Sequence, residues 1–122
     1  MIVNKHLAKA NSRIFIDWLS VNYPVPGIKI RFQKTPVSTL TVAGVTLSTY
    51  GKCKGKSLAI TVQKDVTKEL TTIAHEWRHS MQSPPKGVPI TLGGVQFTYD
   101  PEAEKDANEF AEKVVKLFKE TL

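Results

Sequence analysis

The five residues His75-Glu76-Trp77-Arg78-His79 constrain the fold of this chain more than any other stretch. They lie within a run from Val66 to Gln82 that contains neither glycine nor proline. Within this run, large apolar side chains recur at helical spacing, at Leu70, Ile73, Trp77 and Met81. We therefore predict a helix over residues 66–82 whose apolar arc faces the core, with Trp77 as a packing residue.

The two histidines of this helix are four residues apart, so both side chains leave the same face and can reach one metal ion. Glu76 points about 100° away around the helix, where it can contact a metal-bound water without ligating the metal. Both histidines lie outside the apolar arc, so two ordinary surface histidines are the alternative. The pattern predicts a zinc site with His75 and His79 as ligands and Glu76 as the general base.

The acidic residues that follow open a second predicted helix. Asp100 suits the N-cap and Pro101 the first helical position, and an acidic first turn complements the helix dipole. We expect this helix to continue to about Lys119. Four carboxylates in it compete as a third metal ligand, namely Glu102, Glu104, Asp106 and Glu109.

Glu104 is the carboxylate that the helical pattern favours. On a helical wheel it falls within the apolar arc, whereas the other three lie on the opposite, solvated face. A carboxylate on a buried stripe is costly unless a cation compensates its charge. Zinc sites with two histidines usually take a third protein ligand and leave a fourth position for water. We predict Glu104 as that ligand, with an ion pair to Arg78 or a lysine as the alternative.

Together the two motifs resemble the ImmA/IrrE-type metallopeptidases, whose pattern is HExxH followed by E-x-E-A-N/D-x-F-A. The second motif is matched by Glu104-Lys105-Asp106-Ala107-Asn108-Glu109-Phe110-Ala111, which begins 25 residues after His79. Asp106 stands where the family usually has glutamate or glutamine, and the family's downstream Leu-Met-Pro ending is absent. The likeness covers about the last half of the chain and implies a minimal, gluzincin-like catalytic domain.

The resemblance implies that His75, His79 and Glu104 bind Zn²⁺ and that Glu76 activates the water that hydrolyses a protein or peptide substrate. It further suggests a regulatory protease, acting for example on a DNA-binding repressor encoded by a phage or mobile element. Two other classes stay open. One is a non-catalytic binding module that retains a zinc site, and the other is a zinc hydrolase of a non-peptide substrate.

Hydrolysis would also need a donor for the developing oxyanion. Tyr99, Tyr50, Arg78 and His6 are the candidates, and Tyr99 is the nearest in sequence to Glu104. Ligating histidines usually donate their second ring N–H to a carboxylate, a carbonyl or water. Asn108, one turn beyond Glu104, could serve a ligand in this way or could be an exposed helix residue.

Periodicity predicts an α+β, zincin-like fold with a single domain over residues 1–122. The expected elements are a helix over 5–21, strands over 28–32, 39–50 and 57–62 in a small, mostly antiparallel sheet, the two helices above, and a hairpin over 88–99. A turn or bulge is expected at Ala43-Gly44, and the hairpin should turn around Gly93-Gly94. Lys52, Lys54 and Lys56 are expected in an exposed turn. In zincins the substrate commonly lies extended along a sheet edge.

Charge is uneven along the chain: residues 1–56 carry nine Lys or Arg and one acid, and residues 57–122 carry eight and ten, for a net charge of +6. A solvated basic surface explains this, as does attraction to an acidic partner, but the aromatic residues of a single-strand nucleic-acid binder are missing.

The lone Cys53 allows no internal disulfide, and no apolar run has the length of a membrane span. The N-terminus lacks a signal-peptide core. We therefore expect a cytoplasmic protein without membrane or nucleic-acid partners.

Overall fold

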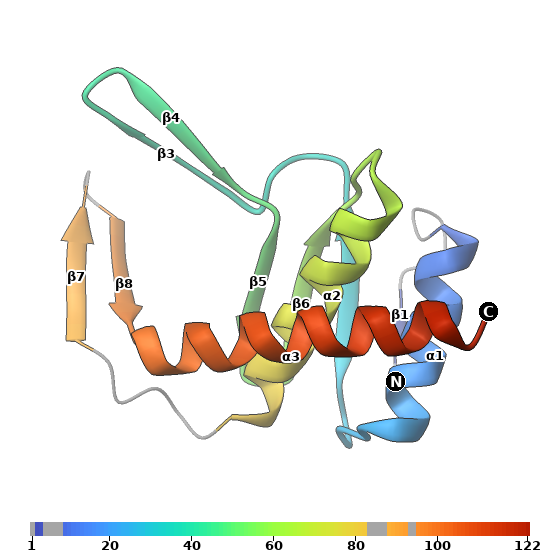
Figure 1. Cartoon of the computed structure of the whole chain (residues 1–122). Coiled ribbons are helices and arrows are strands. Elements are labelled where there is room, and N and C mark those ends of the chain that lie inside the picture. The colour runs from blue at the N-terminus through green and yellow to red at the C-terminus, as the bar shows by residue number, and fades with distance from the viewer. Residues whose placement is uncertain (1, 4–8, 83–87, 93–94) are drawn as a thin grey trace.

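The computed structural model describes residues 2–3, 9–82, 88–92 and 95–122, which form three helices and eight short strands (Figure 1). In chain order these are β1 (Ile2–Val3), α1 (Ala10–Asn22), β2 (Lys29–Gln33), β3 (Ser38–Val42), β4 (Val45–Thr49), β5 (Gly51–Lys54), β6 (Ser57–Thr61), α2 (Val66–Met81), β7 (Val88–Leu92), β8 (Val95–Tyr99) and α3 (Pro101–Glu120). This confirms the α+β class. Among these helices none is long and apolar enough to cross a membrane.

One four-stranded sheet forms the base of the fold, in the order β1-β2-β6-β5. The β1–β2 and β2–β6 pairs are parallel, and only β5–β6 is antiparallel. The expectation of a mostly antiparallel sheet is therefore wrong for this sheet. The reason is the long connection from β2 to β6, which passes through a hairpin and β5 and returns the chain in its original direction. Apolar alternation specifies which face of a strand is buried but not the direction of its neighbour.

The two predicted long helices pack together over this sheet and supply much of the core. On α2 the predicted apolar arc is buried at Leu70, Ile73, Ala74 and Trp77, while Met81, its last residue, is exposed. Trp77 is fully buried and its ring N–H donates to the Tyr23 carbonyl at 2.9 Å, which confirms its packing role. On α3 the buried residues are Ala107, Phe110, Ala111, Val114, Val115 and Phe118, whereas Leu117 is exposed.

Both long helices begin at the residues that carry capping side chains. The Asp65 carboxylate accepts the backbone N–H of Lys68 at 3.0 Å. The Asp100 carboxylate accepts the N–H of Ala103 at 3.1 Å, and Pro101 follows it at the first helical position, as predicted. These caps satisfy backbone donors that have no partner within the helix, and thereby fix where the site-bearing segments start.

The N-terminal helix is shorter than expected. It begins at Ala10 instead of residue 5, and residues 4–8 lie outside the described part of the chain. Its Ser12 hydroxyl donates to the fully buried carboxylate of Glu69, which also accepts the Gln63 N–H at 2.8 Å. Each oxygen of the buried Glu69 carboxylate therefore has a hydrogen-bond partner, and the bond to Ser12 connects α1 to the first turns of α2.

Two hairpins project from this body (Figure 1). In the first, β3 and β4 pair from Ser38–Thr49 to Val42–Val45 and turn at Ala43-Gly44, with φ of 52° and 77°. Two left-handed residues are typical of a two-residue hairpin turn, and the predicted turn is confirmed. The second hairpin, β7–β8, is confirmed by its antiparallel pairing, and its turn at 93–94 lies outside the described residues.

Strand β5 forms one edge of the four-stranded sheet, and among the described strands it pairs with β6 alone. Lys52 and Lys54 belong to this strand and are exposed, while Gly51 and Cys53 face inward. The expectation that Lys52 and Lys54 lie in a turn is therefore wrong, since only Gly55-Lys56 form the turn to β6. The sequence predicts a turn here because β5 is short and contains few apolar residues between its lysines.

Candidate metal centre

Helix α2 presents the two histidines side by side on one face. Both rings are largely buried, with 19% of the His75 side chain and 17% of the His79 side chain exposed. Their Nε2 atoms are 3.0 Å apart and the rings meet nearly edge to face. The opposite, apolar face of α2 is held against the sheet and α3, so packing fixes the direction in which the rings point.

Glu104 meets both histidines from the first turn of α3. Its Oε2 lies 3.0 Å from His75 Nε2, and its Oε1 lies 3.0 Å from His79 Nε2. The side chain is 50% exposed, so the predicted place of Glu104 on a buried stripe is wrong. The buried stripe of α3 begins only at Ala107, because the first turn extends past the core toward the end of α2.

The residues of this cluster suit a metal ion. One donor atom each of His75, His79 and Glu104 lie within 4.8 Å of one another, so the group could hold a single ion. Contacts of 3.0 Å are close to the separation of ligand atoms that share an ion with bonds of about 2 Å. Burial lowers the pKa of His75, and the neighbouring His79 lowers it further. The Glu104 carboxylate and a hydrogen bond with Asn108 raise it, but each by less than burial lowers it. A lowered pKa keeps this imidazole neutral, the form that binds metals.

Gln82 holds the His79 ring, a role that the sequence did not reveal. The Gln82 amide nitrogen donates to the Ala103 carbonyl at 3.0 Å and to the Asp106 carboxylate at 2.9 Å, both of which can only accept. Its amide oxygen therefore faces His79 Nδ1, at 2.7 Å, and Nδ1 must carry the proton. With a proton on Nδ1, Nε2 is the ring nitrogen that can offer a lone pair to the cluster.

Arg78 completes this network. Its guanidinium binds the Asp106 carboxylate through two nitrogens, at 2.8 and 3.2 Å, and lowers the pKa of Asp106. Arg78, which the sequence offered as an alternative partner of Glu104, thus pairs with Asp106. The interaction links α2 to α3.

Glu76 lies beneath the cluster, with only 7% of its surface exposed. Burial raises its pKa to about 7, while His79 lowers the pKa and Glu104 raises it. The pKa of the Cys53 thiol on β5 is raised to about 11, mainly by burial and to a smaller extent by the nearby charge of Glu76. A carboxyl group that titrates near neutrality can take up and release protons at physiological pH.

The backbone of Gly51 packs directly against Glu76. A Cβ atom at position 51 would lie 2.8 Å from Glu76 Oε2 and 2.6 Å from Thr72 Cγ2, which is too close for any side chain. No motif in the sequence marks Gly51 as a site residue. The signal it offered was a glycine at a strand, which often marks a close approach of the backbone to another group.

The predicted oxyanion donors are placed as follows. The Tyr99 backbone ends β8, next to the α3 cap, but its side chain lies outside the described part of the structure, as does His6. Arg78 is engaged with Asp106. Tyr50 is exposed and precedes β5. Of the four candidates, only Arg78 and Tyr50 have described side chains, and neither belongs to the group of His75, His79 and Glu104.

Comparison with protein-family profiles, curated proteins and solved structures finds no significant match to this chain. The resemblance to ImmA/IrrE-type enzymes thus stays a prediction that depends on the two motifs.

Proposed function

We propose that this protein is a zinc-dependent metallopeptidase of the ImmA/IrrE type. The observation that carries the proposal is the convergence of His75, His79 and Glu104 at 3.0 Å, with the buried carboxyl group of Glu76 beside them. These residues come from two helices separated in sequence. A surface pair of histidines would not require a carboxylate from a second helix to meet them.

The donor set favours zinc as the metal. Two imidazoles and one carboxylate form a common ligand set of catalytic zinc sites. Zinc bound there would lower the pKa of a water molecule and polarise a substrate carbonyl. Glu76 is not one of the three side chains that could hold the ion, and its carboxyl group lies against the backbone of Gly51.

Glu76 is the proposed general base and acid. It accepts a proton from the attacking water and returns it to the leaving amine. Its pKa of about 7 suits both roles, since the group can hold the proton between the two steps. A positive ion nearby would shift this pKa downward and favour the carboxylate needed for the first step.

The position of β5 favours a peptide as substrate. This strand is the edge of its sheet, and its first residue, Gly51, contacts Glu76 through backbone atoms. An extended peptide can pair with such an edge through main-chain hydrogen bonds. The scissile bond would then lie beside Glu76. A non-peptide substrate would make no use of the free strand edge.

The decisive experiment replaces Glu76 by glutamine. We expect Glu76→Gln to keep one bound zinc per chain, measured by metal analysis, and to lose peptide hydrolysis by at least about a hundredfold. Glu102→Gln, an exposed carboxylate two residues before Glu104, is the matched control and should hydrolyse like the wild type. Wild-type rates in the Glu76→Gln protein, or a chain that binds no zinc, would contradict the proposal.

The same variant can identify the target. A peptidase that binds substrate without cleaving it retains its complex, so Glu76→Gln should hold a protein that the wild type cuts. A DNA-binding repressor is the target class that the motif resemblance suggests. A pure binding module would instead hold the same partner in both forms and cut it in neither.

A further inference from the structure

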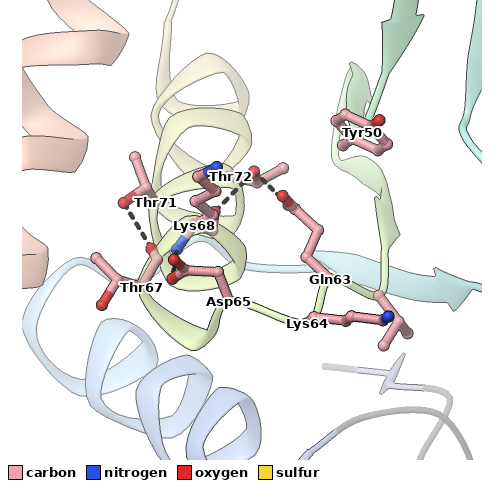
Figure 2. A pocket seen from close by; sticks show the side chains of 9 residues that line it. Tyr50, Gln63, Lys64, Asp65, Thr67, Lys68, Thr71 and Thr72 are labelled. Carbon is pink, nitrogen blue, oxygen red and sulfur yellow. Dashed lines mark hydrogen bonds between the residues drawn. The ribbon is translucent and has the colours of Figure 1, made fainter.

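An open groove of about 680 Å³ lies along the first turns of α2 (Figure 2). Figure 2 shows Tyr50 on one side of this groove and the threonines of α2 on the other, with Gln63 reaching between them. Thr71 and Thr72 line it one helical turn before His75 and Glu76. The groove and the metal centre therefore share one face of α2.

The lining of the groove carries net positive charge, with two lysines against the one carboxylate of Asp65. Lys64 and Lys68 both line it and are exposed, and within the described residues neither has an ion-pair partner. The carboxylate of the lining, Asp65, accepts the Lys68 N–H as the helix cap. The Thr71 and Thr72 hydroxyls donate to carbonyls of their own helix, at 2.7 and 2.9 Å. The two ammonium groups are the charged donors of the lining that have no partner among the described residues, and they suit an anionic ligand.

The distance from the groove to the metal centre matches a few residues of extended peptide. An α-helix rises about 1.5 Å per residue, which puts Lys68 roughly 10 Å from His75 along the axis of α2. An extended chain advances about 3.3 Å per residue. Allowing for the reach of a lysine side chain, a peptide cleaved at the metal centre places its second or third residue from the cleaved bond over the groove.

The direction of β5 indicates which side of the cleaved bond this is. Tyr50 lines the groove and directly precedes Gly51, whereas Cys53 lies further along β5, beside Glu76. Antiparallel pairing is the more stable ladder. A peptide paired antiparallel to β5 runs from Lys54 toward Tyr50, so its C-terminal side lies over the groove.

We propose that this groove selects peptide substrates with Asp or Glu two or three residues to the C-terminal side of the cleaved bond, with Lys64 and Lys68 as the specificity-determining residues. The inference rests on the proposed peptidase function. It adds a substrate class to it, because the metal ligands themselves do not choose a sequence.

The test is digestion of a mixed-sequence peptide library by the zinc-loaded protein, with cleavage sites read by mass spectrometry. We expect Asp and Glu to be enriched roughly three- to tenfold at the second or third position after the cut, the range of a solvent-exposed charge interaction. The double variant Lys64→Gln/Lys68→Gln should lose this enrichment and keep its cleavage of neutral peptides. The matched control, Lys113→Gln/Lys116→Gln on the exposed face of α3, should keep the enrichment.

Binding to the Glu76→Gln protein separates the two proposals. The probes are a labelled Glu-containing octapeptide and its Gln counterpart, followed by fluorescence anisotropy in the presence of zinc. If the library is cut without an acidic preference, or the preference survives in the Lys64/Lys68 variant, the groove proposal is overturned and the peptidase stands. If nothing is cut but the Glu peptide binds more tightly and the lysine variant abolishes this difference, the groove stands and the peptidase is overturned. If the library is not cut and the Glu peptide does not bind, both proposals are overturned.

Discussion

At residue 51 the chain comes so close to the carboxyl group of Glu76 that only glycine fits. A Cβ there would meet Thr72 Cγ2 at 2.6 Å and Glu76 Oε2 at 2.8 Å. We expect Gly51→Ala to move β5 or Glu76, to cost about 1–3 kcal/mol of the free energy of unfolding, and to reduce hydrolysis. Urea unfolding and peptide cleavage measure the two effects.

A second substitution serves as the control for this clash. Thr72→Ser removes the methyl group that the new Cβ would meet, so Gly51→Ala/Thr72→Ser should regain part of the lost stability. A Gly51→Ala protein as stable and as active as the wild type would show that β5 does not press against Glu76.

Glu76 gives the metal-free protein a pH-dependent stability. Its pKa is about 7 in the folded state against 4.5 for the ordinary group. Below about pH 4.5 the carboxyl group is protonated in both states and costs nothing. Between these values the unfolded state loses its proton first, so folding becomes less favourable as the pH rises, and the full penalty applies above pH 7.

Glu76→Gln should therefore stabilise the metal-free protein above pH 7, by up to roughly 3 kcal/mol, with the gain fading toward pH 4.5. Urea unfolding of both proteins in EDTA between pH 4.5 and 8 measures this difference. The exposed control Glu102→Gln should stay within about 0.5 kcal/mol of the wild type throughout. Parallel stability curves for Glu76→Gln and the wild type would disprove the buried, proton-binding state of Glu76.

At the scale of elements, the helices were predictable and the strand partners were not. Apolar periodicity and capping residues belong to one segment, which is why α2 and α3 were predicted to within about two residues at each end. The parallel β2–β6 pair depends on a contact between distant segments, which a local pattern does not contain. The Ala43-Gly44 turn was predictable because its left-handed conformation requires particular residues.

The candidate site divides in the same way. The HExxH pattern placed two histidines and a carboxyl group on one helix, and the wheel of α3 selected Glu104, although for a burial that the structure does not show. Gln82 and Gly51 escaped prediction because each acts across two elements. Neither residue belongs to a local motif, and a glutamine near a helix end is ordinarily a solvated residue.

The contact between α2 and α3 through Gln82 predicts a property of the metal centre. Gln82 accepts from His79 Nδ1 while donating to the Ala103 carbonyl and to Asp106. Gln82→Ala should lower the affinity for zinc by about 10- to 100-fold, the usual effect of losing a partner of a ligating histidine. Competition with a zinc-binding dye measures this affinity. Met81→Ala, at the exposed neighbouring position, is the control, and equal affinities in the two variants would rule out the role of Gln82.

At the scale of the whole molecule, the candidate metal centre draws its residues from two helices that lie 20 or more residues apart in the chain. His75 and His79 belong to α2, and Glu104 belongs to α3, across the second hairpin. Three ligands held in this way do not stay together in an unfolded chain. We therefore expect metal binding to be linked to the folding of the body of the protein, and removal of the ion to loosen the contact between α2 and the first turn of α3.

Zinc should accordingly raise the free energy of unfolding by about 2.7 kcal/mol when its free concentration is a hundred times the dissociation constant. Thermal unfolding with and without zinc measures this gain, and EDTA should reverse it. Glu104→Gln should lose much of the gain because it removes the charged ligand from α3, whereas Glu102→Gln, in the same helical turn, should keep it. Equal stabilisation of the two variants by zinc would mean that the ion binds elsewhere, because only residue 104 contacts both imidazoles among the described carboxylates.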